Sequence, residues 1–145
     1  MMQAALLDVN VLLPALLPQH PAHATATAWL GRQPAGSLRY ALPVQLGVLR
    51  LLSQALVMGA GVLSPEVALK TWAALVEALQ MQEIGAPQPA HGEHLLRFVT
   101  GRTPTPQLWT DAWLAALAHV HGCAMVTFDQ GFRSFPGLAV TLLQP

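Results

Sequence analysis

The hydrophobic positions along this chain fall into short continuous runs that are separated by longer segments of helical pattern. The run at residues 4–7 (AALL) stops at Asp8, and the run at residues 125–128 (MVTF) repeats the pattern and stops at Asp129. Short apolar runs without alternation are typical of strands that are buried in a parallel sheet. We therefore predict two buried strands, each of which ends at an aspartate.

Further elements follow from the same kind of pattern. Residues 138–143 come after a Phe-Pro-Gly turn and predict the last strand, and residues 39–42 predict a weaker one. Residues 23–30 and residues 44–57 predict helices, and two glycines behind the second segment are typical stop signals. Residues 85–91 contain two prolines and predict a loop.

Two more helices carry recognisable end signals. Ser64, Pro65 and Glu66 supply a capping hydroxyl, a proline at the first helical position and an acid in the first turn. Residues 105–106 (TP) open another helix, which runs to about His121 and ends near Gly122. The clearest helix of the chain is therefore expected to begin at residue 65.

Strands that alternate with helices predict an α/β fold, and here we expect a three-layer α/β/α sandwich with a central, mainly parallel sheet. A chain of 145 residues is within the usual size of one domain, so we expect residues 1–145 to form a single domain. Ligands of such folds bind outside the carboxyl ends of the strands. Asp8 and Asp129 are predicted to lie at that edge.

Composition changes this picture in two ways. Charged residues make up only 10% of the chain and their net charge is zero, which predicts apolar surface that is covered by an oligomer or a tight partner. The balanced charge argues mildly against a non-specific nucleic-acid binder. No apolar run reaches the length that crosses a bilayer, and no basic segment opens the chain, so we expect a cytoplasmic protein without membrane association.

The chain has three aspartates, and each stands where solubility does not explain a carboxylate. Asp8 and Asp129 follow apolar strands, and Asp111 shares a helix face with Leu114 and Ala115. Three carboxylates that converge on one sheet edge require a compensating cation, and Mg²⁺ or Mn²⁺ prefers such oxygen ligands. The chemistry that follows is phosphodiester hydrolysis by a metal-activated water. The alternative interpretation is that the aspartates only cap turns and helices.

Four segments, taken in order, resemble the motifs of PIN domains and specifically of VapC-like toxins. They are residues 6–13 (LLDVNVLL), residues 43–52 (PVQLGVLRLL), residues 109–118 (WTDAWLAALA) and residues 126–132 (VTFDQGF), with a closing turn at residues 135–138 (FPGL). The resemblance spans nearly the whole chain.

The resemblance implies a PIN fold, Mg²⁺-dependent endoribonuclease activity on RNA, a VapB-like antitoxin as partner and a homodimer. It implies that Asp8 and Asp111 are the principal metal ligands and that Asp129 is the third acid. Asn10 and Thr127 match polar positions that hold those carboxylates by hydrogen bonds.

One position departs from the family pattern. Many PIN domains carry a glutamate in the second motif, where this chain has Gly47, which weakens the case for a second metal ion. Gln45 either approaches the metal through water or has no role. Arg50 either contacts a substrate phosphate or an antitoxin carboxylate, or is a surface residue. Trp109, beside Asp111, is the tryptophan that we expect to contact RNA or the antitoxin.

Three hypotheses about function remain at this stage. The first is a toxin ribonuclease that uses the three aspartates. The second is a catalytically weakened PIN-fold module that binds RNA or a partner. The third, a phosphatase with Asp8 as nucleophile, is disfavoured because Asn10 stands where that chemistry requires a second aspartate.

Overall fold

One sheet of five strands, in the order β3-β2-β1-β4-β5, organises the computed structural model, which describes residues 3–145. Each pair of neighbouring strands is parallel, which confirms the predicted sheet. Leu7 lies beside Val126, and this register brings the next residues, Asp8 and Thr127, together at the carboxyl edge. The strands are β1 (Ala5–Leu7), β2 (Leu38–Tyr40), β3 (Gln82–Glu83), β4 (Ala124–Thr127) and β5 (Val140–Leu142).

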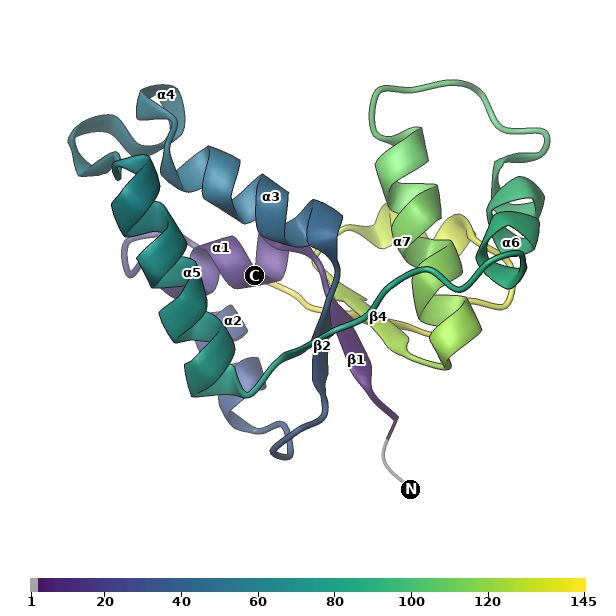
Figure 1. Cartoon of the computed structure of the whole chain (residues 1–145), viewed down its shortest axis with the longest axis horizontal. Coiled ribbons are helices and arrows are strands. Elements are labelled where there is room, and N and C mark those ends of the chain that lie inside the picture. The colour runs from purple at the N-terminus through teal and green to yellow at the C-terminus, as the bar shows by residue number, and fades with distance from the viewer. Residues whose placement is uncertain (1–2) are drawn as a thin grey trace.

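Helices cover both faces of this sheet, so the fold is the predicted α/β sandwich (Figure 1). One group of helices lies on one side of the sheet, and α6 and α7 lie on the other. The first group comprises α1 (Val9–Leu16), α2 (His23–Gly31), α3 (Leu42–Leu52) and α5 (Pro65–Leu79), and the second comprises α6 (Ala90–Val99) and α7 (Leu108–His121). Three short elements complete the described chain: α4 (Ala55–Met58) and the 3-10 helices η1 (Gly59–Gly61) and η2 (Gln130–Ser134).

The end signals read from the sequence act as predicted in two helices. The Ser64 hydroxyl accepts a hydrogen bond from Val67 N (3.2 Å) at the start of α5, with Pro65 as the first helical residue. Gly122 ends α7 with a φ of 67°, a conformation that glycine adopts without strain. The start of α7 differs from the prediction, because the helix begins at Leu108 and residues 105–106 precede it.

The helix predicted over residues 44–57 is wrong as a single element. The chain forms α3 as far as Leu52, turns at Ser53 and Gln54, and resumes as α4. The Ser53 hydroxyl bonds back to Leu49 O (2.9 Å), and Leu52 O accepts from Leu63 N (2.9 Å) rather than from a continuing helix. The bond from Leu63 N satisfies the Leu52 carbonyl where the helix breaks, so the break goes with a contact to the segment that precedes α5.

Besides the 3-10 helices η1 and η2, three elements of the described chain were not predicted. Helix α1 follows Asp8 directly and contains Pro14, which removes one helical hydrogen-bond donor. Helix α6 begins at Ala90, inside the predicted loop of residues 85–91. Strand β3 has two polar residues at an edge of the sheet, so its sequence carries no hydrophobic pattern.

Buried apolar side chains from the sheet and from both helical layers form one cluster. Leu6, Leu7, Met125 and Val126 fill its centre from the two middle strands and are fully buried. The apolar runs of the sequence are therefore the central strands, against which helices pack on both sides.

Within residues 3–145 no single helix is long and apolar enough to cross a membrane. Helix α3 and residues 55–61 together reach the required length and apolar composition, but the two segments meet at an angle of 66°.

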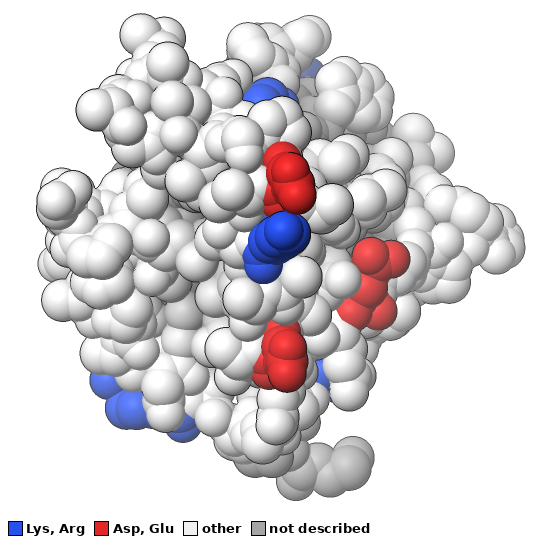
Figure 2. Space-filling model, turned by 60° about the vertical axis from the view of Figure 1, so that its left-hand side comes forward, with Lys and Arg blue, Asp and Glu red and all other residues white. Residues whose placement is uncertain are grey.

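Charged side chains are sparse on the surface, as the composition predicts (Figure 2). Large apolar side chains are exposed instead along the segment from α3 to α5, and we call this group the α3–α5 apolar surface. It consists of Leu42, Leu46, Leu56, Val57, Val62, Val67 and Leu69, of which Leu56 is 99% exposed.

Candidate active site

Asp8 occupies the junction between β1 and α1, where it also caps the helix. Its backbone N donates to Val126 O (3.0 Å), which ties the junction to β4. Its Oδ1 accepts from Val9 N (2.8 Å), and its Oδ2 accepts from the Thr127 hydroxyl (2.8 Å). The end of a buried strand and the start of a helix thus fix both oxygens of this carboxylate.

Asp129 lies two residues beyond β4 and begins η2. Its Oδ1 accepts from Gly131 N (2.8 Å), and its backbone N donates to the Thr127 hydroxyl oxygen (2.9 Å). Its side chain is exposed, in contrast to the partly buried Asp8. The carboxylate therefore has a fixed position and one oxygen that remains free for a ligand.

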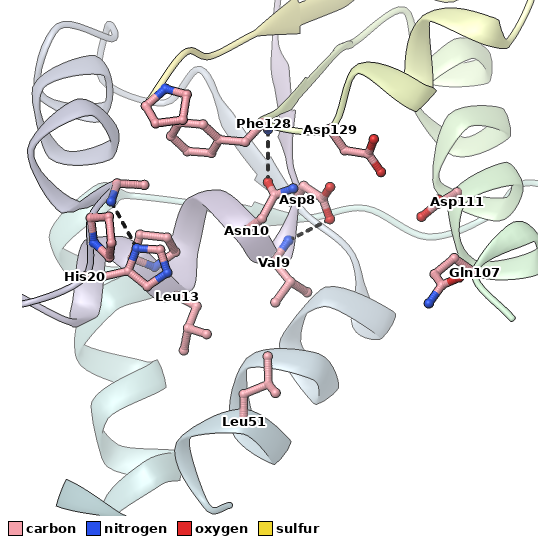
Figure 3. Close-up of a pocket in the computed structure, with 14 residues that line it drawn as sticks. Asp8, Val9, Asn10, Leu13, His20, Leu51, Gln107, Asp111, Phe128 and Asp129 are labelled. Carbon is pink, nitrogen blue, oxygen red and sulfur yellow. Dashed lines mark hydrogen bonds between the residues drawn. The ribbon is translucent and has the colours of Figure 1, made fainter. Parts of the chain in front are cut away.

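Asp111 comes from the opposite helical layer, in the first turn of α7. As the sequence predicts, Leu114, Ala115 and Ala118 on the same face of the helix are buried. The packing of these side chains directs Asp111 toward the carboxyl edge of the sheet. Figure 3 shows Asp8, Asp111 and Asp129 facing one space. The three residues come from the ends of two strands and from one helix.

That space is a cavity of about 510 Å³ with both polar and apolar lining residues. Within residues 3–145, no lysine or arginine belongs to its lining. The polar side chains are Asp8, Asn10, His20, Gln107, Asp111 and Asp129, and the apolar residues are Val9, Leu13, Pro14, Pro21, Ala22, Leu51, Phe128 and Pro145.

The carboxylates perturb one another because they share this cavity. Burial, and then the charges of Asp8 and Asp129, raise the pKa of Asp111 to about 6. Burial also raises the pKa of Asp8, although the bonds from Thr127 and Val9 oppose this shift. Without a cation, Asp111 is therefore partly protonated near neutral pH.

The donor set suits a hard divalent cation such as Mg²⁺ or Mn²⁺, which prefers carboxylate oxygens and neutralises their repulsion. As placed, no three His, Cys, Asp or Glu side chains of the described chain form a group that could hold a metal ion together. Mg²⁺ is usually held by one or two carboxylates and keeps several waters. One or two of these acids, completed by water, fit that coordination, and the ligand roles of Asp8, Asp111 and Asp129 stay predictions.

Thr127 links the two acids of the sheet. Its hydroxyl donates to Asp8 and accepts from Asp129 N and from Asn10 Nδ2 (3.2 Å). Asn10 Oδ1 in turn accepts from Phe128 N (3.1 Å). Thr127 therefore supports Asp8 directly, whereas Asn10 acts on the carboxylates through Thr127 and the backbone of residue 128.

Gly47 is a point of close approach between α3 and the start of α1. A Cβ atom at this position would lie 2.9 Å from Val9 Cγ2, which is shorter than van der Waals contact. A side chain at this position would require the Val9 side chain to shift, and Val9 is the first residue of α1, next to Asp8. The glycine therefore allows close packing of α3 against the start of α1.

The other candidate contacts lie outside the cavity. Gln45 and Arg50 do not line it, and Leu51 is the residue of α3 that does. Trp109 is 62% exposed and lines a separate hollow. Sequence reasoning missed Gln107, although its spacing of four residues from Asp111 places both on one face of α7.

Comparisons with known proteins agree with this geometry. Residues 5–138 match the model of the PIN domain family. The chain is 32% identical to Ribonuclease VapC41 of Mycobacterium tuberculosis over 142 residues, which cover 95% of this chain and 97% of that protein.

Solved structures share the fold. VapC20 of Mycobacterium tuberculosis, described as a Sarcin-Ricin loop cleaving toxin, superposes with a TM-score of 0.68 at 15% identity, covering 94% of this chain and 97% of that one. VapBC2 from Rickettsia felis, bound to a DNA fragment from its promoter, gives 0.67 at 12% identity, with 97% and 99% covered.

The contact between Gly47 and Val9 predicts a coupled pair of substitutions. We expect Gly47→Ala to lower the free energy of unfolding by about 1–3 kcal/mol, because the added methyl group overpacks the contact. Val9→Ala in the same chain should restore much of that loss, as measured by urea denaturation in a double-mutant cycle. Gly31→Ala is the control, since its Cβ meets nothing within 4 Å. Equal effects of Gly47→Ala with and without Val9→Ala would contradict the assignment.

The Thr127 hydroxyl should be needed both for stability and for the charge state of Asp8. We expect Thr127→Val to reduce the free energy of unfolding by roughly 1–3 kcal/mol, because Asp129 N and Asn10 Nδ2 lose their acceptor. Thr127→Ser should retain most of the stability, and Thr141→Val in β5 serves as the matched control. If Thr127→Val is as stable as the parent chain in chemical denaturation, the network does not support the site.

Burial of Asp111 and the charges beside it predict a pH dependence of the metal-free protein. The pKa of Asp111 in the folded chain, about 6, lies above its ordinary value of 3.8, so the folded state binds more protons between these values and stability falls as pH rises through them. In the presence of a chelator, we expect Asp111→Asn to have a higher Tm than the parent chain at pH 7.5, and this difference should shrink toward pH 4.5. Calorimetry with Glu93→Gln as control tests this, and parallel Tm curves for parent and Asp111→Asn would refute it.

Proposed function

The chain belongs to the PIN domain family and, within it, to the VapC ribonucleases, and from that premise we propose that it hydrolyses RNA with a divalent metal ion held by Asp8, Asp111 and Asp129. Its role is that of an endoribonuclease toxin paired with a VapB-like antitoxin. The observation that carries the proposal is the convergence of the three carboxylates on one cavity that no lysine or arginine of the described chain lines. Mg²⁺ is the expected ion, and Mn²⁺ is its substitute.

The residues of the chain have separate tasks in this reaction. Val9 N and the Thr127 hydroxyl hold Asp8 in one orientation and favour its ionised form. Asp111 and Asp129 provide the remaining negative charge, one from each side of the cavity. When bound, a divalent cation lowers the pKa of water and offsets charge on the phosphate oxygens. Hydrolysis then adds one water across a P–O bond of the RNA, so no protein nucleophile is required.

The α3–α5 apolar surface supports the proposed protein partners. Seven exposed apolar side chains on a chain with few charges favour a protein partner that covers part of them. We assign this cover to a homodimer or to the VapB-like antitoxin. Light scattering of the isolated protein distinguishes these partners. A measured mass of two chains supports the homodimer. A mass of one chain, with association only when the antitoxin is added, assigns the surface to the antitoxin.

Replacement of Asp8 tests the reaction most simply. We expect Asp8→Asn to reduce RNA cleavage in Mg²⁺ or Mn²⁺ by more than about a hundredfold, because a ligand charge is lost while the amide oxygen can still accept from Val9 N and cap α1. Glu93→Gln removes an exposed acid by the same change and should leave cleavage unaltered. Circular dichroism verifies that both variants fold, and cleavage of a broad RNA panel is the readout.

Two results would count against the proposal. Undiminished cleavage by Asp8→Asn contradicts the assignment of the site. Absence of metal-dependent cleavage by the parent chain, together with tight binding of an antitoxin, favours the second hypothesis of a weakened binding module, to which the glycine at position 47 gives some support.

A further inference from the structure

A second hollow lies beside the candidate active site, between the beginnings of α3 and α7. It has a volume of about 230 Å³ and is lined by Pro43, Trp109, Thr110 and Trp113. Two indole rings and a proline ring therefore account for most of its wall, and none of its lining residues is charged. We call it the tryptophan cleft.

One wall of the tryptophan cleft is exposed and the other is held in place. Trp109 is 62% exposed, which is unusual for a side chain whose burial contributes so much to stability. Trp113 is partly buried, and the ring of buried His91 packs against it with centroids 4.8 Å apart. His91 Nε2 also donates to Trp113 O (3.0 Å). The cleft is thus formed before a ligand binds, which reduces the ordering that binding requires.

The tryptophan cleft adjoins the acidic cavity along the surface of α7. Gln107 lines the cavity and Thr110 lines the cleft, and residues three apart are neighbours on a helix surface. Asp111 and Trp109, two residues apart, project from different sides of the helix. A single ligand that fills both the acidic cavity and the tryptophan cleft must therefore have two parts. An anionic group lies at the carboxylates, and a flat apolar group lies in the cleft on another side of α7.

We propose that the tryptophan cleft binds an unpaired base of the RNA, in a nucleotide that flanks the one whose phosphate enters the acidic cavity. This inference rests on the proposed ribonuclease function and adds the position at which a base of the substrate is held, on one side of α7. Bases stack on exposed indole rings whatever their sequence, whereas both faces of a base are covered inside a duplex. The hydroxyl of Thr110 provides one polar group for the edge of the base.

Binding can be measured without cleavage in chains that carry Asp8→Asn. The probes are fluorescein-labelled single-stranded RNA oligonucleotides of mixed sequence and the same strands annealed to their complements, with Mg²⁺ present and fluorescence anisotropy as the readout. We expect single strands to bind more tightly than duplexes. Trp109→Ala should weaken single-strand binding by roughly tenfold, because stacking of one base is worth about 1–3 kcal/mol. Trp109→Phe should retain most of the affinity.

Leu96→Ala is the matched control, because Leu96 is 67% exposed on α6 and its loss should change nothing. The inference is overturned if Trp109→Ala leaves single-strand affinity intact, if it weakens duplex binding equally, or if the parent prefers duplexes. A change of oligomeric mass in Trp109→Ala would also overturn it, by assigning the indole to a second copy of the chain. Cleavage of the same RNAs by chains with intact Asp8 is scored separately, so a failure of the proposed function is distinguished from a failure at the cleft.

Discussion

Repulsion between carboxylates at the carboxyl edge of the parallel sheet is the constraint on which the rest of this site depends. The fold holds Asp8, Asp111 and Asp129 around one cavity, where burial, and then the charges of Asp8 and Asp129, raise the pKa of Asp111 to about 6. Folding alone would favour the removal of such charges. Their retention has a physical explanation if a cation and an RNA phosphate share the cavity with them.

The sheet supplies the precision that this arrangement needs. Parallel pairing of β1 with β4 places Asp8 next to Thr127, and the Thr127 hydroxyl then joins Asp8 to the backbone of Asp129. Asp111 approaches from α7 on the opposite layer, where buried alanines allow the helix to lie close to the strands. The positions of Asp8 and Asp129 therefore depend on the register of the strands, and the position of Asp111 depends on the packing of α7.

Much of this could be predicted from the sequence because the decisive signals are local. The apolar runs that end at Asp8 and Asp129 predict strands whose carboxyl ends share an edge, and Ser64 and Gly122 mark helix ends through their own hydrogen bonds and conformation. Strand β3 and the break after Leu52 escaped prediction, because each depends on a partner segment distant in the sequence. Helix α1 escaped because Pro14 obscures its pattern.

The interior of the site was less accessible to sequence reasoning. The position of Gly47 seemed to be a lost ligand, whereas its contact with Val9 shows a steric role that no linear pattern contains. Gln107 and the tryptophan cleft likewise depend on how α7 lies against α3 and the sheet. The sequence pattern therefore predicted which acids come together, but it did not predict the shape of the cavity around them.

A crystal of the protein grown with Mn²⁺ and measured at an anomalous wavelength tests the central claim most directly. The account predicts one anomalous peak in the acidic cavity, with oxygens of Asp8 and Asp111 at about 2 Å and Asp129 bound directly or through water. A map with no peak among the three carboxylates, at a Mn²⁺ concentration that saturates other sites, would contradict it.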